Sequence, residues 1–112
     1  MEGHPVVSVK AMKRYRRQAD VVQALAHPIR IAIADLLKQG ERCVCDIADH
    51  IGAERSNVSR HLSVMLKAGV VSTRKEGVMV FYELRTPCIL NFLACATDVL
   101  RHNLEEEAKT LA

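Results

Sequence analysis

The sequence predicts a mainly α domain of the α+β class, a winged helix-turn-helix in which four helices are followed by a β-hairpin and a fifth helix. Three observations predict it: apolar residues recur at spacings of three and four, glycines separate these segments, and two β-rich runs follow the fourth of them. The length of 112 residues suits one small domain that spans residues 1–112.

The N-terminal region is expected to hold an arm and two helices. Residues 1–7 are expected to form a flexible arm, and residues 8–25 the first helix, because apolar side chains recur there at helical spacing. Pro28 suits the first turn of a second helix, since its missing N–H would be unpaired there. We expect this helix to end near Gln39, just before a glycine.

Two further helices and a hairpin are expected in the middle of the chain. Residues 44–51 and 56–68 each carry an apolar stripe and are each followed by glycine. The short link between them predicts a helix-turn-helix pair. Two β-rich runs follow, at residues 70–75 and 78–84, with Glu76-Gly77 as the expected two-residue turn.

The last helix is expected over residues 86–109, where Thr86-Pro87 opens it. Its apolar residues cover an arc too wide for a solvated tail. Such a helix should pack on the first helix and on its copy in a partner subunit. The sequence therefore predicts a homodimer formed through the first and last helices.

The helix over residues 56–68 has the features of a DNA recognition helix. Small polar and cationic side chains gather near its N-terminus, where they can reach base edges and phosphates in the major groove. Two cations near the hairpin tip are placed to follow the DNA backbone or probe the minor groove. A generic helical hairpin with a solvated polar face is the alternative, which the adjoining hairpin disfavours. The expected DNA-binding residues are Ser56, Asn57, Ser59, Arg60, His61, Arg74 and Lys75.

Cys43 and Cys45 lie one residue apart, immediately before this pair of helices. Thiolate sulfur suits soft ions such as trivalent arsenic and antimony, and divalent cadmium and lead. A helix N-terminus favours thiolate, and a Cys-x-Cys disulfide would close a small, strained ring. We therefore expect the two thiols to chelate a thiophilic ion. The alternative is that both are small, buried apolar side chains.

Composition narrows the classes of function. A formal net charge of +3 is compatible with nucleic acid as a partner. The chain has neither the pattern of a secretory signal nor an apolar run of membrane-spanning length, so we expect a cytoplasmic protein without a membrane partner. In that reducing compartment, four cysteines favour free thiols or metal ligands. The sequence lacks Cys-x-x-Cys, a phosphate loop and a Ser-His-Asp pattern, so no enzyme and no organic cofactor is expected.

The combination of four motifs resembles the ArsR/SmtB family of metal-responsive transcriptional repressors, over about residues 24–84. The resemblance implies a homodimer that binds a two-fold operator in double-stranded DNA and is released when metal binds. Relatives with a Cys-x-Cys pair bind arsenite-type or cadmium/lead-type inducers there, so arsenite or antimonite is expected here, with cadmium and lead as alternatives. The motifs are Cys43-Val-Cys-Asp-Ile-Ala, Ser56-x-Val-Ser-Arg-His-Leu, Ala68-Gly-Val-Val and Arg74-Lys-Glu-Gly.

The chain departs from two patterns within that family. One arsenic-sensing pattern has a further cysteine where this sequence has Ala48, and the cadmium-sensing pattern uses cysteines of the partner's N-terminal arm, where this sequence offers only His4. The third ligand is therefore open among Cys88, Cys95, His4 and solvent. Cys88 is the expected third sulfur, and packing at the dimer interface is the alternative role of Cys88 and Cys95.

Two further alternatives concern the region of the last helix: a zinc-type metal site and a redox-sensing thiol. The zinc-type site that some relatives carry there is not expected, because Thr86, Cys88, Val99 and His102 stand near its ligand positions. The remaining functional alternative is a thiol-redox regulator of DNA binding, with Cys88 or Cys95 as the sensing thiol.

Overall fold

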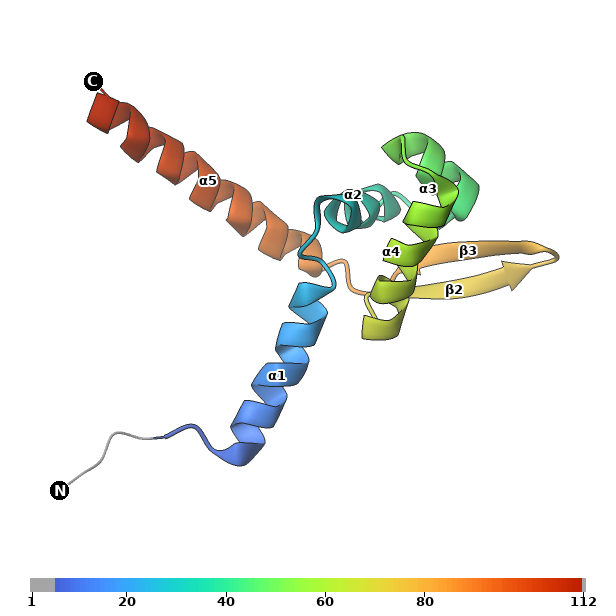
Figure 1. The fold of residues 1–112 in the computed structure, drawn as a ribbon, viewed down its shortest axis with the longest axis horizontal. Coiled ribbons are helices and arrows are strands. Elements are labelled where there is room, and N and C mark those ends of the chain that lie inside the picture. Colours follow the sequence, from blue (N-terminus) through green and yellow to red (C-terminus); the bar gives the residue numbers. More distant parts are fainter. Residues whose placement is uncertain (1–5, 112) are drawn as a thin grey trace.

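The computed structural model describes residues 6–111 and confirms the winged helix-turn-helix. Figure 1 shows α2, α3, α4 and the strands gathered together, with α1 and α5 projecting from them in different directions. Residues 1–5 of the expected arm, including His4, lie outside the described residues. The elements in chain order are α1 (Val9–Gln23), α2 (Pro28–Leu37), β1 (Arg42–Cys43), α3 (Val44–Ile51), α4 (Arg55–Ala68), β2 (Val71–Glu76), β3 (Met79–Leu84) and α5 (Ile89–Leu111).

Local capping explains where the helices begin and end. The Ser8 hydroxyl accepts a hydrogen bond from the Ala11 N–H at 3.0 Å and so caps α1. The Nδ1 atom of His27 accepts the Ile29 N–H at 3.1 Å at the start of α2. Gly52 ends α3 in the left-handed conformation, with φ of 75°, which a side chain would disfavour.

The hydrophobic core lies between α2, α3, α4 and the sheet. Its buried residues form the stripes whose spacing predicts these helices, and burying each large side chain stabilises the fold by about 1.5–3 kcal/mol. By contrast, α1 and α5 have no buried residue within the described chain. The largest fully buried side chains are Ile33, Val58, Leu62, Met65, Ile47, Val70 and Val71.

The sheet has the strand order β1-β3-β2 and is antiparallel throughout. Strand β1 was not predicted, because its two residues are too few to show an alternating pattern. It joins the chain before α3 to the wing, since Cys43 pairs with Phe81 of β3. The predicted hairpin turn was wrong by one residue. Glu76 belongs to β2 and pairs with Met79, so the two turn residues are Gly77 and Val78 rather than Glu76 and Gly77. Gly77, with φ of 61°, supplies the positive φ that such a tight turn needs.

Four of the five helices differ from the prediction at one or both ends, α4 only in starting at Arg55 rather than at residue 56. Helix α1 covers Val9–Gln23 rather than residues 8–25, and α2 ends at Leu37, two residues before the expected end. Helix α5 begins at Ile89 rather than at residue 86, because Thr86 and Pro87 form the turn that precedes it. At its other end α5 extends to Leu111.

The C-terminal end of α1, the link to α2 and the first turns of α5 line an open apolar groove of about 360 Å³. Four apolar side chains of α5, from Phe92 to Leu104, are each more than half exposed. A soluble monomer rarely leaves so long an apolar face uncovered. No helix within residues 6–111 combines the length and apolarity that a membrane span needs. The groove is lined by Val21, Val22, Leu25, Ala26, Ile31, Cys88, Ile89, Phe92, Leu93 and Ala96.

Candidate nucleic-acid interface and thiol pair

Helix α4 turns its apolar side inward and its polar side outward. Val58, Leu62 and Met65 are fully buried in the core. Of the residues predicted to read DNA, Ser56 and Arg60 are exposed, and the others on this helix are half-buried. The exposed surface of α4 therefore holds Ser56 and Arg60, while the other three predicted residues are partly covered. That surface can present hydroxyl, amide and guanidinium groups to a groove edge.

A tight turn sets the angle between α3 and α4. The N–H groups of Gly52 and Ala53 both donate to the Ala48 carbonyl, at 2.8 and 3.3 Å. Glu54 then occupies the N-cap of α4 without a side-chain hydrogen bond to the helix, among the residues described. The first N–H groups of α4 are thus open to an anion such as a DNA phosphate.

The side chain of His61 is half-buried and contacts another ring, unlike a fully exposed residue of a recognition helix. Its ring lies 4.3 Å from that of His27, centroid to centroid, with the planes tilted by 45°. Partial burial lowers the pKa of His61, and the nearby charges of His27, Arg30 and Arg60 lower it further. The neutral ring is therefore favoured, and it packs the recognition helix against the start of α2. The sequence did not indicate this pairing.

In the wing, Arg74 lies in β2, three residues before Gly77, and carboxylates hold it. Its guanidinium is ion-paired with Glu41 and donates to Glu76 at 2.8 Å. It also lies 4.9 Å above the centroid of the Phe81 ring. Hydrogen bonding between Arg74 and Glu41 raises the pKa of Arg74 and lowers the pKa of Glu41.

Lys75, the next residue, is exposed and makes no ion pair with any residue in the described range 6–111. The two predicted wing cations therefore differ. Arg74 braces the wing against the loop before β1 and can contact DNA only by exchanging its carboxylate partners for a phosphate. Lys75 can contact a phosphate without giving up an ion pair.

Cys43 and Cys45 lie at the junction of β1 and α3. Cys43 is the last residue of β1, occupies the N-cap of α3 and is buried, with 7% of its surface exposed. Its side chain makes no capping hydrogen bond with α3 in the described structure. Cys45 is half-buried in the first turn. The burial of Cys43 fits the alternative of apolar packing, while the partial exposure of Cys45 leaves its sulfur within reach of an ion.

Cys88 and Cys95 have a different environment. Both are exposed, and Cys88 lines the groove between α1 and α5. Within residues 6–111 of one chain, no three side chains of His, Cys, Asp or Glu gather closely enough to hold a metal ion. A single described chain thus offers the two adjacent thiols of residues 43 and 45, without Cys88 beside them.

The amino-acid sequence is similar to known transcriptional regulators. Residues 27–73 match the profile of a family described as bacterial regulatory protein, arsR family. The uncharacterized HTH-type transcriptional regulator Rv0081 of Mycobacterium tuberculosis is 37% identical over 98 residues, which cover 87% of this chain and 86% of that protein.

The names of two relatives refer to cadmium or arsenical resistance. The cadmium resistance transcriptional regulatory protein CadC homolog of Staphylococcus aureus is 40% identical over 59% of this chain and 55% of its own length. The arsenical resistance operon repressor of Staphylococcus xylosus is 33% identical over 62% of this chain and 67% of its own length.

The fold is also similar to a solved structure. The homodimeric winged helix-turn-helix DNA-binding domain Mb0332 of Mycobacterium bovis, a possible ArsR-family regulator, superposes with a TM-score of 0.74. It shares 31% sequence identity, and the match covers 95% of each chain.

Proposed function

We propose that this chain, which belongs to the ArsR family of DNA-binding transcriptional regulators, is a repressor that leaves its operator when a thiophilic ion binds Cys43 and Cys45. The observation that carries the proposal is the position of the two thiols. They lie where the positioning helix of the helix-turn-helix meets the strand that joins it to the wing.

An ion at this junction would act on both DNA-contacting elements. Through α3 it would shift the helix against which the recognition helix α4 packs. Through β1 it would shift the wing, because Cys43 pairs with Phe81, whose ring lies under Arg74. The ion weakens DNA binding only if it prefers the DNA-incompetent geometry. Such coupling is typically about 1–3 kcal/mol, or roughly a 5- to 150-fold change in affinity.

The donor chemistry favours a soft ion. Two thiolates near a helix N-terminus suit arsenite or antimonite, and the family resemblance of the Cys-x-Cys motif points the same way. Cadmium and lead are the alternatives, and the S. aureus and S. xylosus relatives named for cadmium and arsenical resistance support both classes. Cys88 can complete the site only if a second copy, or a rearrangement on ion binding, brings its sulfur there.

We assign DNA contact to the outward side of α4 and to the wing. The exposed side chains of Ser56 and Arg60 would reach bases and phosphates in the major groove, and Lys75 would follow the backbone. His61, which packs against His27, would support the helix more than it reads bases. The full proposed set remains Ser56, Asn57, Ser59, Arg60, His61, Arg74 and Lys75.

We also infer that the working form is a homodimer joined through α1 and α5. The open groove between these helices and the exposed apolar side chains of α5 support this inference. So does the similarity to the homodimeric M. bovis domain. Two copies would place their recognition helices about one DNA turn apart, roughly 34 Å, on a two-fold operator.

Direct titration of the fully reduced protein with arsenite tests the site. We expect about one ion per chain, a loss of two or three free thiols, and sulfur-to-metal absorbance. Cys43→Ser and Cys45→Ser should each abolish tight binding, with Cys95→Ser as the matched control. Loss of one further thiol that disappears in Cys88→Ser would identify the third donor. Full stoichiometry in the Cys43→Ser/Cys45→Ser variant would contradict the assignment.

A thiol-redox regulator is the second candidate, because Cys88 and Cys95 are exposed. Mild oxidation followed by mass spectrometry separates the two candidates. A redox regulator would lose DNA affinity as Cys88 or Cys95 becomes modified, and Cys43→Ser would leave that response intact. An ion sensor would respond to the ion under fully reducing conditions.

A further inference from the structure

We propose that the cationic face of α1, formed by Lys10, Lys13, Arg14 and Arg17, binds DNA phosphates additional to those reached by α4 and the wing. The proposal rests on the DNA binding of the family and not on the ion response. It identifies a third DNA-contacting element, in the helix that otherwise serves the inferred dimer.

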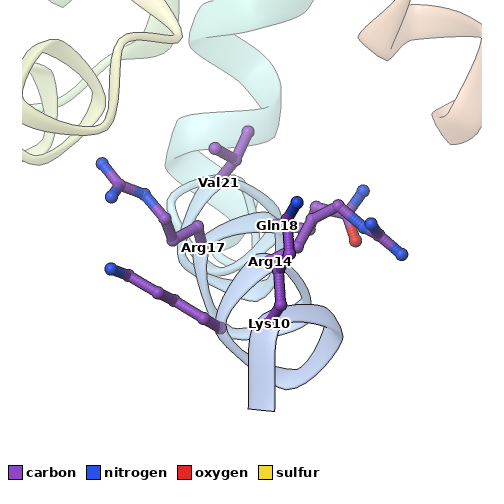
Figure 2. Close-up of a pocket in the computed structure, with 6 residues that line it drawn as sticks. Lys10, Arg14, Arg17, Gln18 and Val21 are labelled. Atoms are coloured by element: carbon purple, nitrogen blue, oxygen red, sulfur yellow. The ribbon is translucent and has the colours of Figure 1, made fainter. Parts of the chain in front are cut away.

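The four cations share one side of α1. Their spacing of three and four residues places them above one another on the helix. Figure 2 shows Lys10, Arg14 and Arg17 projecting outward from this side, with Gln18 and Val21 beside them. All four cations are exposed, and none makes an ion pair with another residue in the range 6–111. Together with Gln18 and Val21 they line a shallow hollow of about 430 Å³.

The opposite side of α1 is apolar. Met12, Tyr15 and Val22 lie there, and Val22 lines the groove shared with α5. A dimer joined through that groove would cover the apolar side of α1 as far as Val21, which borders both the groove and the cationic hollow, and would leave the four cations outside the groove. A lipid surface would instead need the apolar side of the helix to enter the membrane. The two-sided pattern therefore favours a polyanion that meets the cations alone.

Four of the sixteen basic residues of the chain cluster on this face. The chain has 16 Lys and Arg residues against 13 Asp and Glu residues, for a net charge of +3. Without the four cations of the face, twelve basic residues would remain against the thirteen acidic ones, for a net charge of −1. A cluster of four cations on one surface attracts a polyanion to that surface, whatever the small net charge of the whole chain.

The end of α1 that follows the cationic face lies close to the recognition helix. The C-terminal end of α1 and the C-terminal end of α4 line one groove, to which α1 contributes Asp20 and Gln23, and α4 contributes Val64 and Lys67. Arg30 lines the same groove, and its buried Nε has no hydrogen-bond partner among the described residues. A duplex bound by α4 would reach the cationic face by extending past the C-terminal end of α4 toward α1.

The salt dependence of operator binding tests the proposal, because each phosphate contact adds about 0.9 to the slope of log K against log salt concentration. The variant changes all four cations to Gln, a good helix former, in the reduced, ion-free, full-length protein. Affinity is measured by fluorescence anisotropy on the operator, from about 50 to 300 mM salt. We expect the slope to fall by about 4 per dimer, if half of the eight side chains touch phosphate, and affinity to fall at least tenfold near 100 mM salt.

Control variants test whether a fall in the salt slope is specific to the cationic face of α1. The control variant removes the same charge elsewhere, through Lys38→Gln, Arg85→Gln, Arg101→Gln and Lys109→Gln, and its slope should stay within about 1 of the wild-type value. Sedimentation must show the same oligomeric state for both variants. The conservative Arg14→Lys/Arg17→Lys variant should retain the wild-type slope, because counterion release depends on charge.

Three results would overturn the proposal. The first is an unchanged slope in the four-Gln variant, and the second is an equal loss in the control. The third is selective loss of binding to phosphatidylglycerol vesicles with DNA binding intact, which would assign the face to a membrane surface. None of these results depends on arsenite or cadmium, so they are distinct from a failure of the ion response.

Discussion

Residues 24–84 and the two flanking helices differ in how they obtain their stability. Every buried apolar residue lies between Ala24 and Leu84, whereas α1 and α5 have no buried residue in the described chain. The central region can therefore stabilise its own fold. Of the flanking helices, α5 packs on the core through Ile89 and Leu90 at its start, and by our inference both helices are covered by a second copy of the chain.

The cysteines follow the same division. Cys43 and Cys45 belong to the packed region that carries the recognition helix, whereas Cys88, in the turn before α5, and Cys95, on α5, are exposed. A ligand at the first pair would act on a region held by close packing, where a small shift is transmitted rather than absorbed. By our proposal, ion binding and dimer formation therefore belong to different regions. Variants of the packed region should lose stability or the ion response, and variants of the flanking helices should lose dimer affinity.

The largest expected effect is on the packed region. Leu62→Ala removes a fully buried side chain and should lower the free energy of unfolding by about 2–5 kcal/mol, measured by urea denaturation. Leu104→Ala on α5, where the side chain is 65% exposed, is the matched control. Its loss should be smaller and should shrink as protein concentration rises. Equal losses at all concentrations would contradict the division.

Phe92→Glu should weaken the inferred dimer interface of the flanking helices while sparing the packed region. Phe92 lines the apolar groove, and a carboxylate there would be desolvated on association. We expect the dimer dissociation constant to rise about 100-fold by analytical ultracentrifugation, with the circular dichroism of the helices largely kept. Asn91→Glu, at the exposed neighbouring position, is the control. A dimer of undiminished affinity in Phe92→Glu would place the interface elsewhere.

Glu41→Gln should loosen the wing from the packed region by a smaller amount. Because Arg74 lowers the pKa of Glu41 below its ordinary 4.5, the ion pair contributes stability above pH 4.5 and loses it as pH falls through the lowered value. At pH 7 we expect a small drop in Tm and faster hydrogen exchange in β2. Glu83→Gln, a substitution in the same sheet, should leave exchange unchanged. If both variants behave alike, the Arg74 brace has no structural role.

The smallest expected effect comes from His61. A lowered folded-state pKa means that the unfolded chain takes up the proton first, so stability is lost as pH falls below the ordinary 6.5. Wild-type protein should therefore lose slightly more Tm between pH 7.5 and pH 5.5 than His61→Gln does. NMR titration of the ring should give a pKa below 6.5. A value above it would contradict the packing against His27.

The sequence predicted most of the packed region because its signals are local. Apolar spacing and a following glycine placed α3 at residues 44–51, as observed, and α4 within one residue of its start. The same pattern identified the buried stripe of Val58, Leu62 and Met65. These features need only neighbours along the chain, so periodicity is sufficient to find them.

Features that join distant residues were not predictable in the same way. The bond between Arg74 and Glu41 spans 33 residues, and nothing local marks it. The ring contact of His27 with His61 and the pairing of Cys43 with Phe81 likewise depend on how helices and strands pack. The two adjacent thiols were visible in the sequence, but the connection of Cys43 to the wing required β1, which is too short to leave a pattern.

The most direct test of the central claim is operator affinity of the reduced dimer with and without arsenite. The wild-type protein should lose about 5- to 150-fold in affinity when the ion is bound, and Cys43→Ser/Cys45→Ser should bind the operator equally well in both conditions. Antimonite, cadmium and lead are measured in parallel. If none of the four ions weakens wild-type binding, or if the double variant is released at the same ion concentration, Cys43 and Cys45 do not control the DNA-binding state.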